Sequence, residues 1–433
     1  MNNFVAVCVG CRSGMMRQGG VFIFLSRRRK PHFLTNSALP SYTEKQIAMS
    51  ERNRKPLSDR CVLGTLTAGH IVDDIYMNTL PPFLPVLIGS SGLSFAAAGL
   101  LVTFFTITSS VSQPFIGFVI DRYRIRWIGA LGLIWAGVFF GLMGLVRGYA
   151  ALIVLATLAG IGPAMFHPHA LSAVSGIATG SRGRIMSVFI IGGNIGFAIG
   201  PVLIGALTSS MGQAGMVYMA IPGLLMGMFI AKLSSQFGNG LRTEFHPVSM
   251  NDVRPTVILI IVAVLRSWVY FSVLSYLPSY FVHLGSSVLR ANSLLSLMLL
   301  AGVTGQFTGG TLSDRFGRKE VTMGSLLLAA PLLLIFLYAT GPVAMVALFL
   351  FGFSVMASFS VTMVMMHEIM HRHIGIASGI MIGFALGVGG LGVMITGILA
   401  DGFGLHAALT VLVIGLVAAG ILTRFVPLGQ SHA

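Results

Sequence analysis

The chain has 433 residues, of which 55% are hydrophobic and only 9% are charged, and its formal net charge is +15. A soluble globular domain carries about 25% charged residues, so this composition excludes an ordinary soluble enzyme or binding domain. A positive balance can indicate nucleic-acid binding, but here the basic residues fall mainly in short connections between long apolar runs. Such runs are long enough to cross about 30 Å of hydrocarbon as helices. We therefore expect a membrane protein that contacts lipid and no nucleic acid.

The first 48 residues differ from the rest of the chain. A short apolar piece, Val21–Leu25, precedes the basic run Arg27–Lys30, which reverses the order of charge and apolar segment in a secretory signal. The segment is either a targeting arm or sequence upstream of a native start at Met49, and we expect the second. Its removal takes away seven Lys and Arg residues and one Glu, which lowers the net charge to +9.

The apolar runs predict an all-α membrane fold with twelve transmembrane helices. Their expected ranges are 62–86, 94–118, 127–146, 149–172, 184–208, 214–233, 255–282, 292–313, 321–340, 343–367, 374–400 and 405–426. The longest polar stretch among them, Ser234–Asn251, divides them six from six. We expect a polar extension at 1–60, a six-helix bundle at 61–233, a cytoplasmic linker at 234–254 and a second six-helix bundle at 255–433.

Basic residues between the expected spans lie mostly on one side of the membrane. That side carries Arg122, Arg124, Arg126, Arg182, Arg184, Lys232, Arg242, Arg254, Arg315, Arg318, Lys319 and Arg372, and the other carries Arg147 and Arg290. Short loops rich in Lys and Arg stay on the cytoplasmic side of a membrane. The distribution therefore predicts that both termini and the central linker are cytoplasmic.

Two stretches of the sequence repeat at an offset of 193 residues. The matching pairs are Gln113 with Gln306, Gly117 with Gly310, Asp121 with Asp314, Arg122 with Arg315, Tyr123 with Phe316, and Arg126 with Lys319. The Gly-rich stretches 192–201 and 383–392 lie at nearly the same spacing. Transporters built from two parallel repeats place their substrate sites near the bilayer midplane, between the repeats.

The repeated stretch resembles the loop signature of the major facilitator superfamily. Gly310-x-x-x-Asp314-Arg315-Phe316-Gly317-Arg318-Lys319 is the fuller copy, and the first copy has Arg124 where the second has Gly317. The run Gly196–Gly205, which contains Gly200-Pro201, is similar to the Gly-Pro motif that antiporters of this family carry in helix 5. The resemblance implies a transporter with two six-helix repeats.

Four further stretches resemble bacterial fosmidomycin-resistance-type efflux proteins. They are Ala68–Asp74, Phe166–Pro168, Ile191–Gly196 and Gly383–Gly392, and the likeness extends from about Leu63 to the C-terminus. It implies a proton-coupled antiporter of the bacterial inner membrane that exports a small toxic compound such as a phosphonate antibiotic. We expect a monomer that uses no cofactor and no metal.

Asp73 and Asp74 lie about ten residues into the first expected span, near the midplane. Ionisable residues inside a membrane are costly, and each is a candidate functional residue by default. Neighbouring residues point about 100° apart on a helix, so at most one of these carboxylates is expected to face the centre of the cavity. Asp74 is also the better match to the efflux family, and we predict it as the proton carrier. The alternative is a structural acid, hydrogen-bonded to a neighbouring helix.

Arg266 lies about as deep in the seventh span and matches Asp73 by the repeat offset of 193 residues. Under one interpretation, Arg266 binds an anionic substrate while a proton on the carboxylate competes for the same partner, as antiport requires. Under the other, the two residues form a permanent salt bridge that neutralises both charges.

Other polar residues within the spans are candidates for smaller roles. His70 shares a helix face with Asp74 at i, i+4 and is predicted to tune or relay its proton, because histidine titrates near neutrality. His167 is a second candidate for that role. His167, Gln113, Gln306 and Asn194 are candidates for substrate binding, and Asn194 is expected to hydrogen-bond across the bundle. A purely structural role is the alternative for the histidines, and close packing is the alternative for Asn194 and the glycines around it.

The signature residues at the cytoplasmic helix ends are predicted to gate transport without binding cargo. They are Gly117, Asp121, Arg122, Gly310, Asp314, Arg315, Arg318, Lys319 and Glu368. Their charges suit the helix dipoles and are expected to hold the two halves closed on this side. The alternative is that they only set the membrane topology.

One motif indicates a different class of function. His367-Glu368-x-x-His371 matches the zinc-protease motif H-E-x-x-H, in which two imidazoles share a helix face. The motif falls at the cytoplasmic end of the tenth span with no convincing third ligand, so a metalloprotease is the remote alternative. The chain has no P-loop sequence for nucleotide binding, so transport must use an ion gradient. An uptake symporter for a small organic anion is therefore the main alternative to proton-coupled export.

Overall fold

The computed structural model describes residues 58–123, 125–177, 182–237, 253–370 and 377–427. Within these ranges the chain is helical apart from short turns, and no strand occurs. The N-terminal extension to residue 57, most of the central linker and Arg372 lie outside the described residues. The prediction of an all-helical fold is therefore confirmed for the part of the chain that is described.

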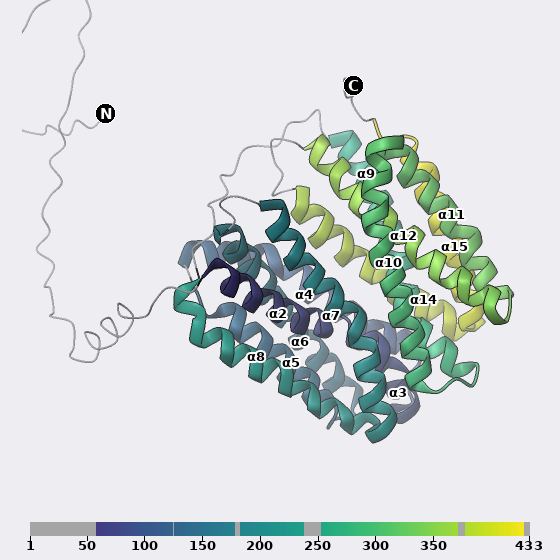
Figure 1. Cartoon of the computed structure of the whole chain (residues 1–433). Helices are drawn as coiled ribbons and strands as arrows, with labels where there is room; N and C mark the ends of the chain where they lie inside the picture. The colour runs from purple at the N-terminus through teal and green to yellow at the C-terminus, as the bar shows by residue number, and fades with distance from the viewer. Residues whose placement is uncertain (1–57, 124, 178–181, 238–252, 371–376, 428–433) are drawn as a thin grey trace, which may run out of the picture. The chain divides into compact units, whose positions relative to one another are not determined.

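The α-helices follow one another with short connections (Figure 1). They are α2 (Asp59–Met77), α3 (Leu80–Ser91), α4 (Phe95–Tyr123), α5 (Ile128–Met143), α6 (Tyr149–Ile177), α7 (Arg182–Met211), α8 (Ala220–Leu233), α9 (Val253–His283), α10 (Val288–Phe316), α11 (Arg318–Tyr338), α12 (Gly341–Ile369), α14 (Leu386–Phe403) and α15 (Leu405–Thr423). Nine helical segments among the described residues are long and apolar enough to span a membrane, and α5 is a shorter apolar helix.

The first expected span, 62–86, is interrupted in the structure. Helix α2 ends at Met77 and α3 begins at Leu80, with Asn78 and Thr79 between them. Pro81 and Pro82 follow at once, and proline suits the first turn of a helix because its missing N–H would be unsatisfied there. Asn78 Nδ2 donates to Phe197 O at 2.9 Å, and Thr79 Oγ1 donates to Ile75 O at 2.8 Å. The N–H groups of Asn78 and Thr79 donate to Asp74 O and Tyr76 O, both at 3.2 Å, so the break does not leave these two donors bare in the membrane.

Two other expected spans contain irregular helix. Residues Gly212–Met219 form a 3₁₀-helix before α8, and Gly379–Ala385 form a π-helix before α14. A π-helical turn inside an otherwise α-helical segment is rare and is found most often at functional sites. The π-helix includes Gly383, the first residue of the Gly-rich stretch at 383–392.

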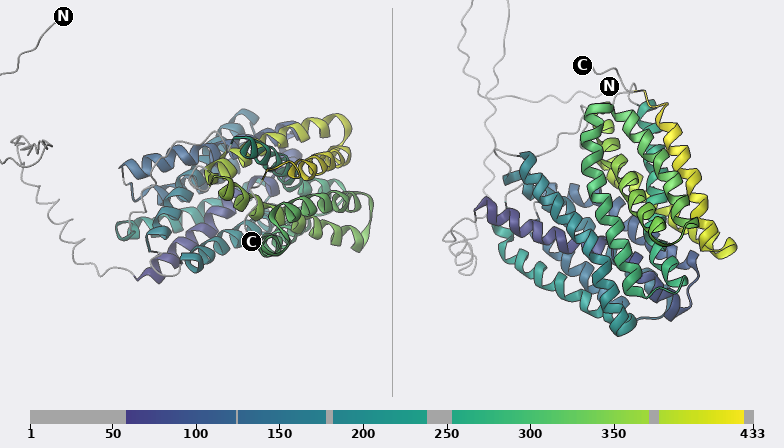
Figure 2. Two further views of the ribbon diagram at one scale, coloured as in Figure 1. Left: turned by 90° about the horizontal axis from the view of Figure 1, so that it is seen from above. Right: turned by 45° about the vertical axis from the view of Figure 1, so that its right-hand side comes forward.

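The helices form two sets in chain order, which we call the first helix group (α2–α8) and the second helix group (α9–α15). Figure 2 shows the purple-to-teal helices gathered beside the green-to-yellow ones. Within the first group α5 packs on α6 and α2 on α7, and within the second α12 packs on α10 and α11. The two groups meet through α4 with α14, α7 with α10, and α3 with α9.

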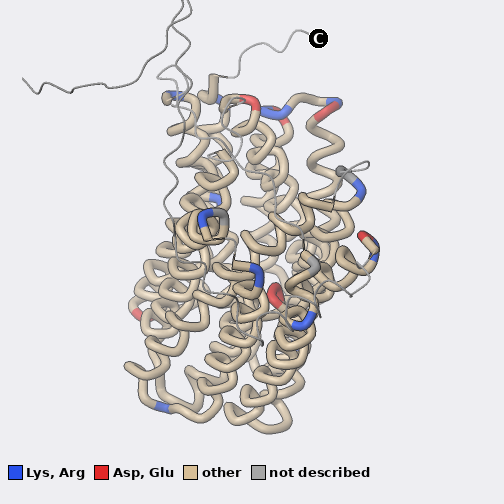
Figure 3. The backbone as a smooth tube through the Cα atoms, turned by 90° about the vertical axis from the view of Figure 1, so that its left-hand side faces the viewer, with Lys and Arg blue, Asp and Glu red and all other residues tan. Residues whose placement is uncertain are grey.

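Charged residues are sparse along the helices. In Figure 3 nearly all of the tube is tan, and the blue and red segments lie mainly toward helix ends. Large apolar side chains such as Phe115, Leu225, Val343 and Ile414 are exposed on the outside of the bundle. An exposed apolar surface of this extent is expected where lipid covers the protein. The few ionisable groups inside the bundle therefore define the candidate site.

Candidate functional site

Helix α2 carries three ionisable residues into the interior of the first helix group. The helix starts at a Ser58 cap, whose side chain accepts from Cys61 N, and runs unbroken through His70, Asp73 and Asp74. Asp73 has no exposed surface, and the side chains of His70 and Asp74 are 9% and 16% exposed. The expected i, i+4 pair is present, with His70 Nε2 lying 3.5 Å from Asp74 Oδ2.

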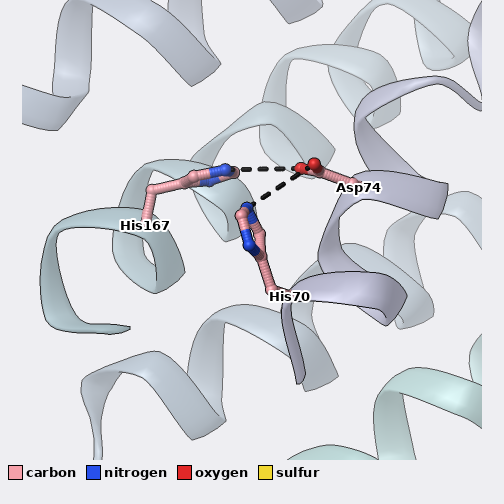
Figure 4. Close-up of side chains that lie close together, drawn as sticks. All are labelled: His70, Asp74 and His167. Carbon is pink, nitrogen blue, oxygen red and sulfur yellow. Dashed lines mark ion pairs between the residues drawn. The ribbon is translucent and has the colours of Figure 1, made fainter. Parts of the chain in front are cut away.

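A fourth ionisable residue, His167, comes from α6 (Figure 4). It lies between Pro163 and Pro168, both inside the helix. Its Nδ1 atom is 2.8 Å from Asp73 Oδ2 and 3.3 Å from Pro163 O, and its Nε2 atom is 3.3 Å from Asp74 Oδ1. The histidine therefore faces both carboxylates of α2. We call His70, Asp73, Asp74 and His167 the acid–histidine cluster.

The geometry of the cluster restricts where protons can reside. Both ring nitrogens of His167 lie within ion-pair distance of a carboxylate oxygen, an arrangement that the doubly protonated imidazolium serves best. His70 Nδ1 lies 2.8 Å from Phe189 O, a carbonyl that can only accept. His70 Nδ1 is therefore the donor, and Nε2 faces Asp74 Oδ2.

Helix α7 covers the cluster from a third side. The Phe189 ring stacks on His70 with centroids 4.1 Å apart. Gly193 lies so close that an added Cβ would overlap Asp74 Oδ2 and the His70 ring. Next to it, Asn194 Nδ2 is buried without a hydrogen-bond partner among the described residues. The expected hydrogen bond from Asn194 across the bundle is therefore absent for this Nδ2 atom.

The same donors have the composition of a transition-metal site. His70, Asp74 and His167 each offer one ligand atom, and these atoms lie within 4.8 Å of one another. A histidine bound to a metal uses one nitrogen for the ion and the other for a hydrogen bond. Both histidines meet that condition here, because His167 Nδ1 lies 2.8 Å from Asp73 Oδ2 and His70 Nδ1 lies 2.8 Å from Phe189 O. The arrangement therefore suits a shared proton and a bound metal ion alike.

Arg266 on α9 is the buried cation of the second helix group. The residue is 1% exposed, and its guanidinium carbon lies 4.9 Å from the centroid of the Phe359 ring. Its polar contacts are weak, since Nη2 lies 3.4 Å from Ser267 Oγ and Nε has no partner. Among the described residues no carboxylate lies within ion-pair distance of this guanidinium.

The expected alternative of a permanent salt bridge between Asp73 and Arg266 is wrong for this structure. Asp73 pairs with His167 on α6, within its own helix group. The repeat offset correctly indicated two buried charges of opposite sign, but Asp73 pairs with His167 of its own helix group and not with Arg266. Arg266 is left with an aromatic face and a hydroxyl. Its counter-charge is missing from the described part of the chain.

The two glutamines occupy equivalent places on α4 and α10, apart from the cluster. Gln113 Nε2 donates to Ser109 O of its own helix at 2.8 Å. The backbone carbonyl of Gln306 accepts from Ser360 Oγ at 2.8 Å. Both side chains are partly exposed. The structure thus does not bring them together with the acid–histidine cluster.

The signature residues of the second repeat form a charged network at one end of the helices. Arg318 Nη1 donates to Asp314 Oδ1 at 2.7 Å and to Ser313 Oγ at 2.9 Å, and its Nε donates to Glu368 Oε1 at 2.6 Å. This network ties α10, α11 and α12 together, all of which belong to the second helix group.

The remaining basic signature residues are accessible to solvent. Arg122 and Arg315 are exposed, and Lys319 is partly exposed. Gly117 faces Pro168 and Gly310 faces Ser360, both at ordinary contact distance for an added Cβ. The side chain of Asp121 lies outside the described residues. The first-repeat signature therefore shows no ion pair in the part of the chain that is described.

The described part of the H-E-x-x-H motif is engaged in other contacts. His367 Nε2 lies 2.8 Å from Ser378 Oγ, and Glu368 pairs with Arg318. His371 lies outside the described residues. Glu368 therefore belongs to the charged network of Arg318 and Asp314.

Sequence reasoning missed two aromatic residues that complete these sites. Phe189 fixes His70 through its carbonyl and its ring, and Phe359 supports the Arg266 guanidinium. No local pattern distinguishes these phenylalanines from the other 28 in the chain, which has 30 in total. The neighbouring Gly192-Gly193 pair was visible as a sign of close helix approach, but the helix that it contacts was not.

Comparison with known proteins agrees with this architecture. The family model of the Major Facilitator Superfamily matches residues 66–382 and 259–432. The fosmidomycin resistance protein of Escherichia coli (strain K12) is 29% identical over 377 residues, which cover 84% of this chain and 92% of that protein. The MFS-type transporter YfnC of Bacillus subtilis (strain 168) is 30% identical over 386 residues, which cover 84% and 91%.

Solved structures show the same fold at low sequence identity. A bacterial homologue of the human lysosomal transporter Spinster matches with a TM-score of 0.71 and 17% identity, over 85% of this chain and 96% of the other. The xylose transporter XylE from E. coli matches with a TM-score of 0.69 and 15% identity, over 87% and 98%. Together with the family match over most of the sequence, these findings show that the chain belongs to the major facilitator superfamily and resembles its fosmidomycin-resistance-type members.

Proposed function

We propose that this protein is a secondary transporter that exports a small anionic toxic compound, such as a phosphonate antibiotic, in exchange for protons. The observation that carries the proposal is the position of His167 between Asp73 and Asp74 inside the first helix group. Two carboxylates and two imidazoles lie close together there, so uptake or loss of one proton changes the net charge of the whole cluster.

Asp74 is the proposed proton carrier. It is the more exposed carboxylate of the cluster, and it faces Nε2 of both histidines. Asp73, with no exposed surface, serves as the fixed counter-charge of His167. His70 tunes or relays the proton of Asp74, and His167, predicted from sequence as a cargo ligand, becomes part of the proton site.

Arg266 is the proposed cargo-binding residue. A buried guanidinium without a counter-charge is costly, and an anionic ligand would supply the missing charge through charge-assisted hydrogen bonds. The E. coli relative is named for resistance to fosmidomycin, which supports an exported antibiotic as the cargo class. The unpaired amide of Asn194 is a second cargo contact, and Gln113 and Gln306 remain candidates along the path.

Because Asp73 pairs with His167 and not with Arg266, proton and cargo need not compete for one residue. Coupling then arises from alternating access: each ligand favours a different arrangement of the two helix groups, and only differential binding can shift that equilibrium. The network of Arg318, Asp314 and Glu368 is the proposed rigid base of the second group on the cytoplasmic side. The other signature residues, among them Asp121, Arg122 and Lys319, complete the gate.

The membrane arrangement is part of the proposal. We infer twelve transmembrane helices in two six-helix repeats at 61–233 and 255–433, joined by a cytoplasmic linker at 234–254. Both termini are cytoplasmic in a bacterial inner membrane, because basic residues predominate in the loops on that side. The functional unit is a monomer.

Proton movement in everted membrane vesicles tests the function. The vesicles are energised so that their lumen is acidic, and fosmidomycin, a related phosphonate or a cationic drug is then added outside. Export in exchange for protons should release lumenal protons with the phosphonates and not with the cationic drugs. Vesicles that contain Asp74→Asn should give no release, and vesicles with Asp59→Asn, a change in the exposed first turn of α2, should behave as wild type.

Three results would contradict parts of the proposal. No proton release with any compound would rule out antiport of these cargoes. Proton uptake with an organic anion would indicate the symporter instead. Release that disappears when a chelator removes trace zinc, and returns with added zinc, would show that the cluster works with a metal ion.

A further inference from the structure

The two helix groups are tied together by a carboxylate at one end of α4. Asp401, in the last turn of α14, accepts hydrogen bonds from Phe95 N at 2.7 Å and from Ala96 N at 2.9 Å. These are the first two residues of α4. The contact joins residues that are 306 and 305 positions apart in the chain, one from each helix group.

The bonding is that of a helix cap supplied by another helix. The first N–H groups of a helix have no partner within it, and a negative charge there also interacts favourably with the helix dipole. Ser94 Oγ accepts from Ala97 N at 3.2 Å, so α4 caps one of these groups itself. The other two depend on Asp401. Separation of α14 from α4 would leave both N–H groups to water.

Neutral contacts also join the two helix groups. The Tyr276 hydroxyl on α9 lies 2.9 Å from Phe95 O and 3.0 Å from Val393 O. Asn292 Nδ2 on α10 donates to Pro82 O of α3 at 3.1 Å. Tyr276 and Asn292 are both fully buried, whereas Asp401 is exposed. Asp401 is thus the charged, water-accessible member of the contact.

The position of Asp401 in the chain places it away from the basic loops. It precedes the last span, on the side that carries Arg147 and Arg290, whereas Asp59, Asp314, Glu320 and Glu368 belong to the opposite helix ends. Outside the acid–histidine cluster it is the one acid on its side among those with described side chains. In the proposed topology that side faces away from the cytoplasm.

We propose that Asp401 is a gating residue that holds the non-cytoplasmic entrance closed by capping α4 from the other helix group. Alternating access requires this entrance to open once in every transport cycle. An exposed carboxylate suits a bond that must break repeatedly, because water can replace it on both sides at small cost. The inference rests on the proposed transport cycle and topology, and it is independent of the cargo and of proton coupling.

The test is a distance measurement across the closed end in the full-length protein in lipid bilayers. Cys8, Cys11 and Cys61 are replaced by serine, and spin labels are attached at Gly148→Cys and Leu284→Cys, which are exposed loop positions in the two groups. Double electron–electron resonance then gives the populations of short and long distances between the two spin labels, without cargo or gradient. Asp401→Ala is compared with Ser94→Ala, which removes a cap of the same helix turn without touching the second group.

Loss of an N-cap side chain changes an equilibrium by about 2- to 30-fold. We expect Asp401→Ala to raise the ratio of long to short separations within that range, Asp401→Asn to raise it less, and Ser94→Ala to leave it unchanged. An unchanged ratio in Asp401→Ala, or an equal shift in Ser94→Ala, would overturn the proposal. If Asp401→Ala does not give a folded protein, Asp401→Asn is the deciding variant. A higher ratio of long to short separations than in wild type then supports the proposal, and an unchanged ratio overturns it. Because no cargo is present, failure of antiport in vesicles would leave this result standing.

Discussion

Nδ1 of His167 lies 2.8 Å from Oδ2 of Asp73, so an imidazole on α6 neutralises a carboxylate on α2 that has no contact with solvent. This pairing connects two helices through a bond whose strength depends on a proton. It also explains why Arg266, the residue at the matching position of the second repeat, has no acidic partner among the described residues.

Replacement of His167 should destabilise the protein because it leaves Asp73 buried without a cation. Removing one partner of a buried pair costs about 3–5 kcal/mol. We expect His167→Gln to lower the free energy of unfolding by a value in this range, and Asp73→Asn in the same chain to restore part of it. Thermal unfolding in detergent measures both. His283→Gln, at an exposed position, is the control. Additive losses in the double variant would contradict the pairing.

Asp74→Asn should separate cargo binding from proton coupling. The amide cannot carry a proton between the two faces, but it leaves Arg266 in the other helix group untouched. We expect proton release in everted vesicles to disappear while the affinity of purified protein for a phosphonate is unchanged. Calorimetric titration gives that affinity. A variant that still releases protons would show that another group carries them.

Arg266→Gln should weaken the binding of anionic cargo. A hydrogen bond to a charged group contributes about 1.5–3 kcal/mol, which corresponds to roughly 10- to 100-fold in the dissociation constant. Arg266→Lys should lose less, because it keeps the charge without the planar fork. Arg254→Gln changes an exposed arginine of the same helix and is the matched control. Equal effects of the two glutamine variants would exclude a specific site.

Gly193→Ala should disturb the acid–histidine cluster directly. The added methyl group would overlap Asp74 Oδ2 and the His70 ring, so α7 or the cluster must move. Overpacking of this kind costs about 1–3 kcal/mol. We expect a lower unfolding temperature together with loss of proton release. Gly64→Ala on α2, where an added Cβ meets nothing within 4 Å, should leave both unchanged.

Glu368→Gln should slow transport with little effect on stability. The carboxylate is 47% exposed, and exposed ion pairs contribute about 0–1 kcal/mol. Its partner Arg318 would keep Asp314, so the network is weakened and not abolished. We expect a reduced rate of cargo export, an unfolding temperature close to wild type and no bound zinc in either protein. Zinc that is present in wild type and lost in the variant would revive the H-E-x-x-H motif.

The sequence predicted the helical fold well because a membrane span has a strong signal of length and composition. It predicted less well where polar side chains interrupt a helix. Residues 62–86 contain enough apolar residues for one span, which outweighed the sign of a helix break that Pro81 and Pro82 give, and the structure ends α2 at Met77. The π-helix at Gly379–Ala385 was likewise invisible, because it depends on packing and not on composition.

For the site, the sequence identified the members of the acid–histidine cluster but not their pairing. The expense of charge in a membrane singled out Asp73, Asp74 and Arg266. Which of them meet depends on how α2, α6 and α7 pack, and hydrophobic periodicity does not encode that. His167 was predicted as a cargo ligand because nothing in the sequence of its own helix indicates the acids of α2 that it faces.

The interruption between α2 and α3 has a mechanical consequence. The ladder of α-helical hydrogen bonds is broken after Asn78, because Thr79 N bonds to Tyr76 O and Pro81 and Pro82 have no N–H to donate. We therefore expect this point to act as a hinge about which α2 turns without rotating α3. The part of the first span that carries His70, Asp73 and Asp74 can therefore rotate while α3 stays packed on α9. A proton-driven rotation of α2 would stay local unless neighbouring helices transmit it. Helices α6 and α7, which pack on α2 at the cluster, would then carry the motion to the rest of the protein.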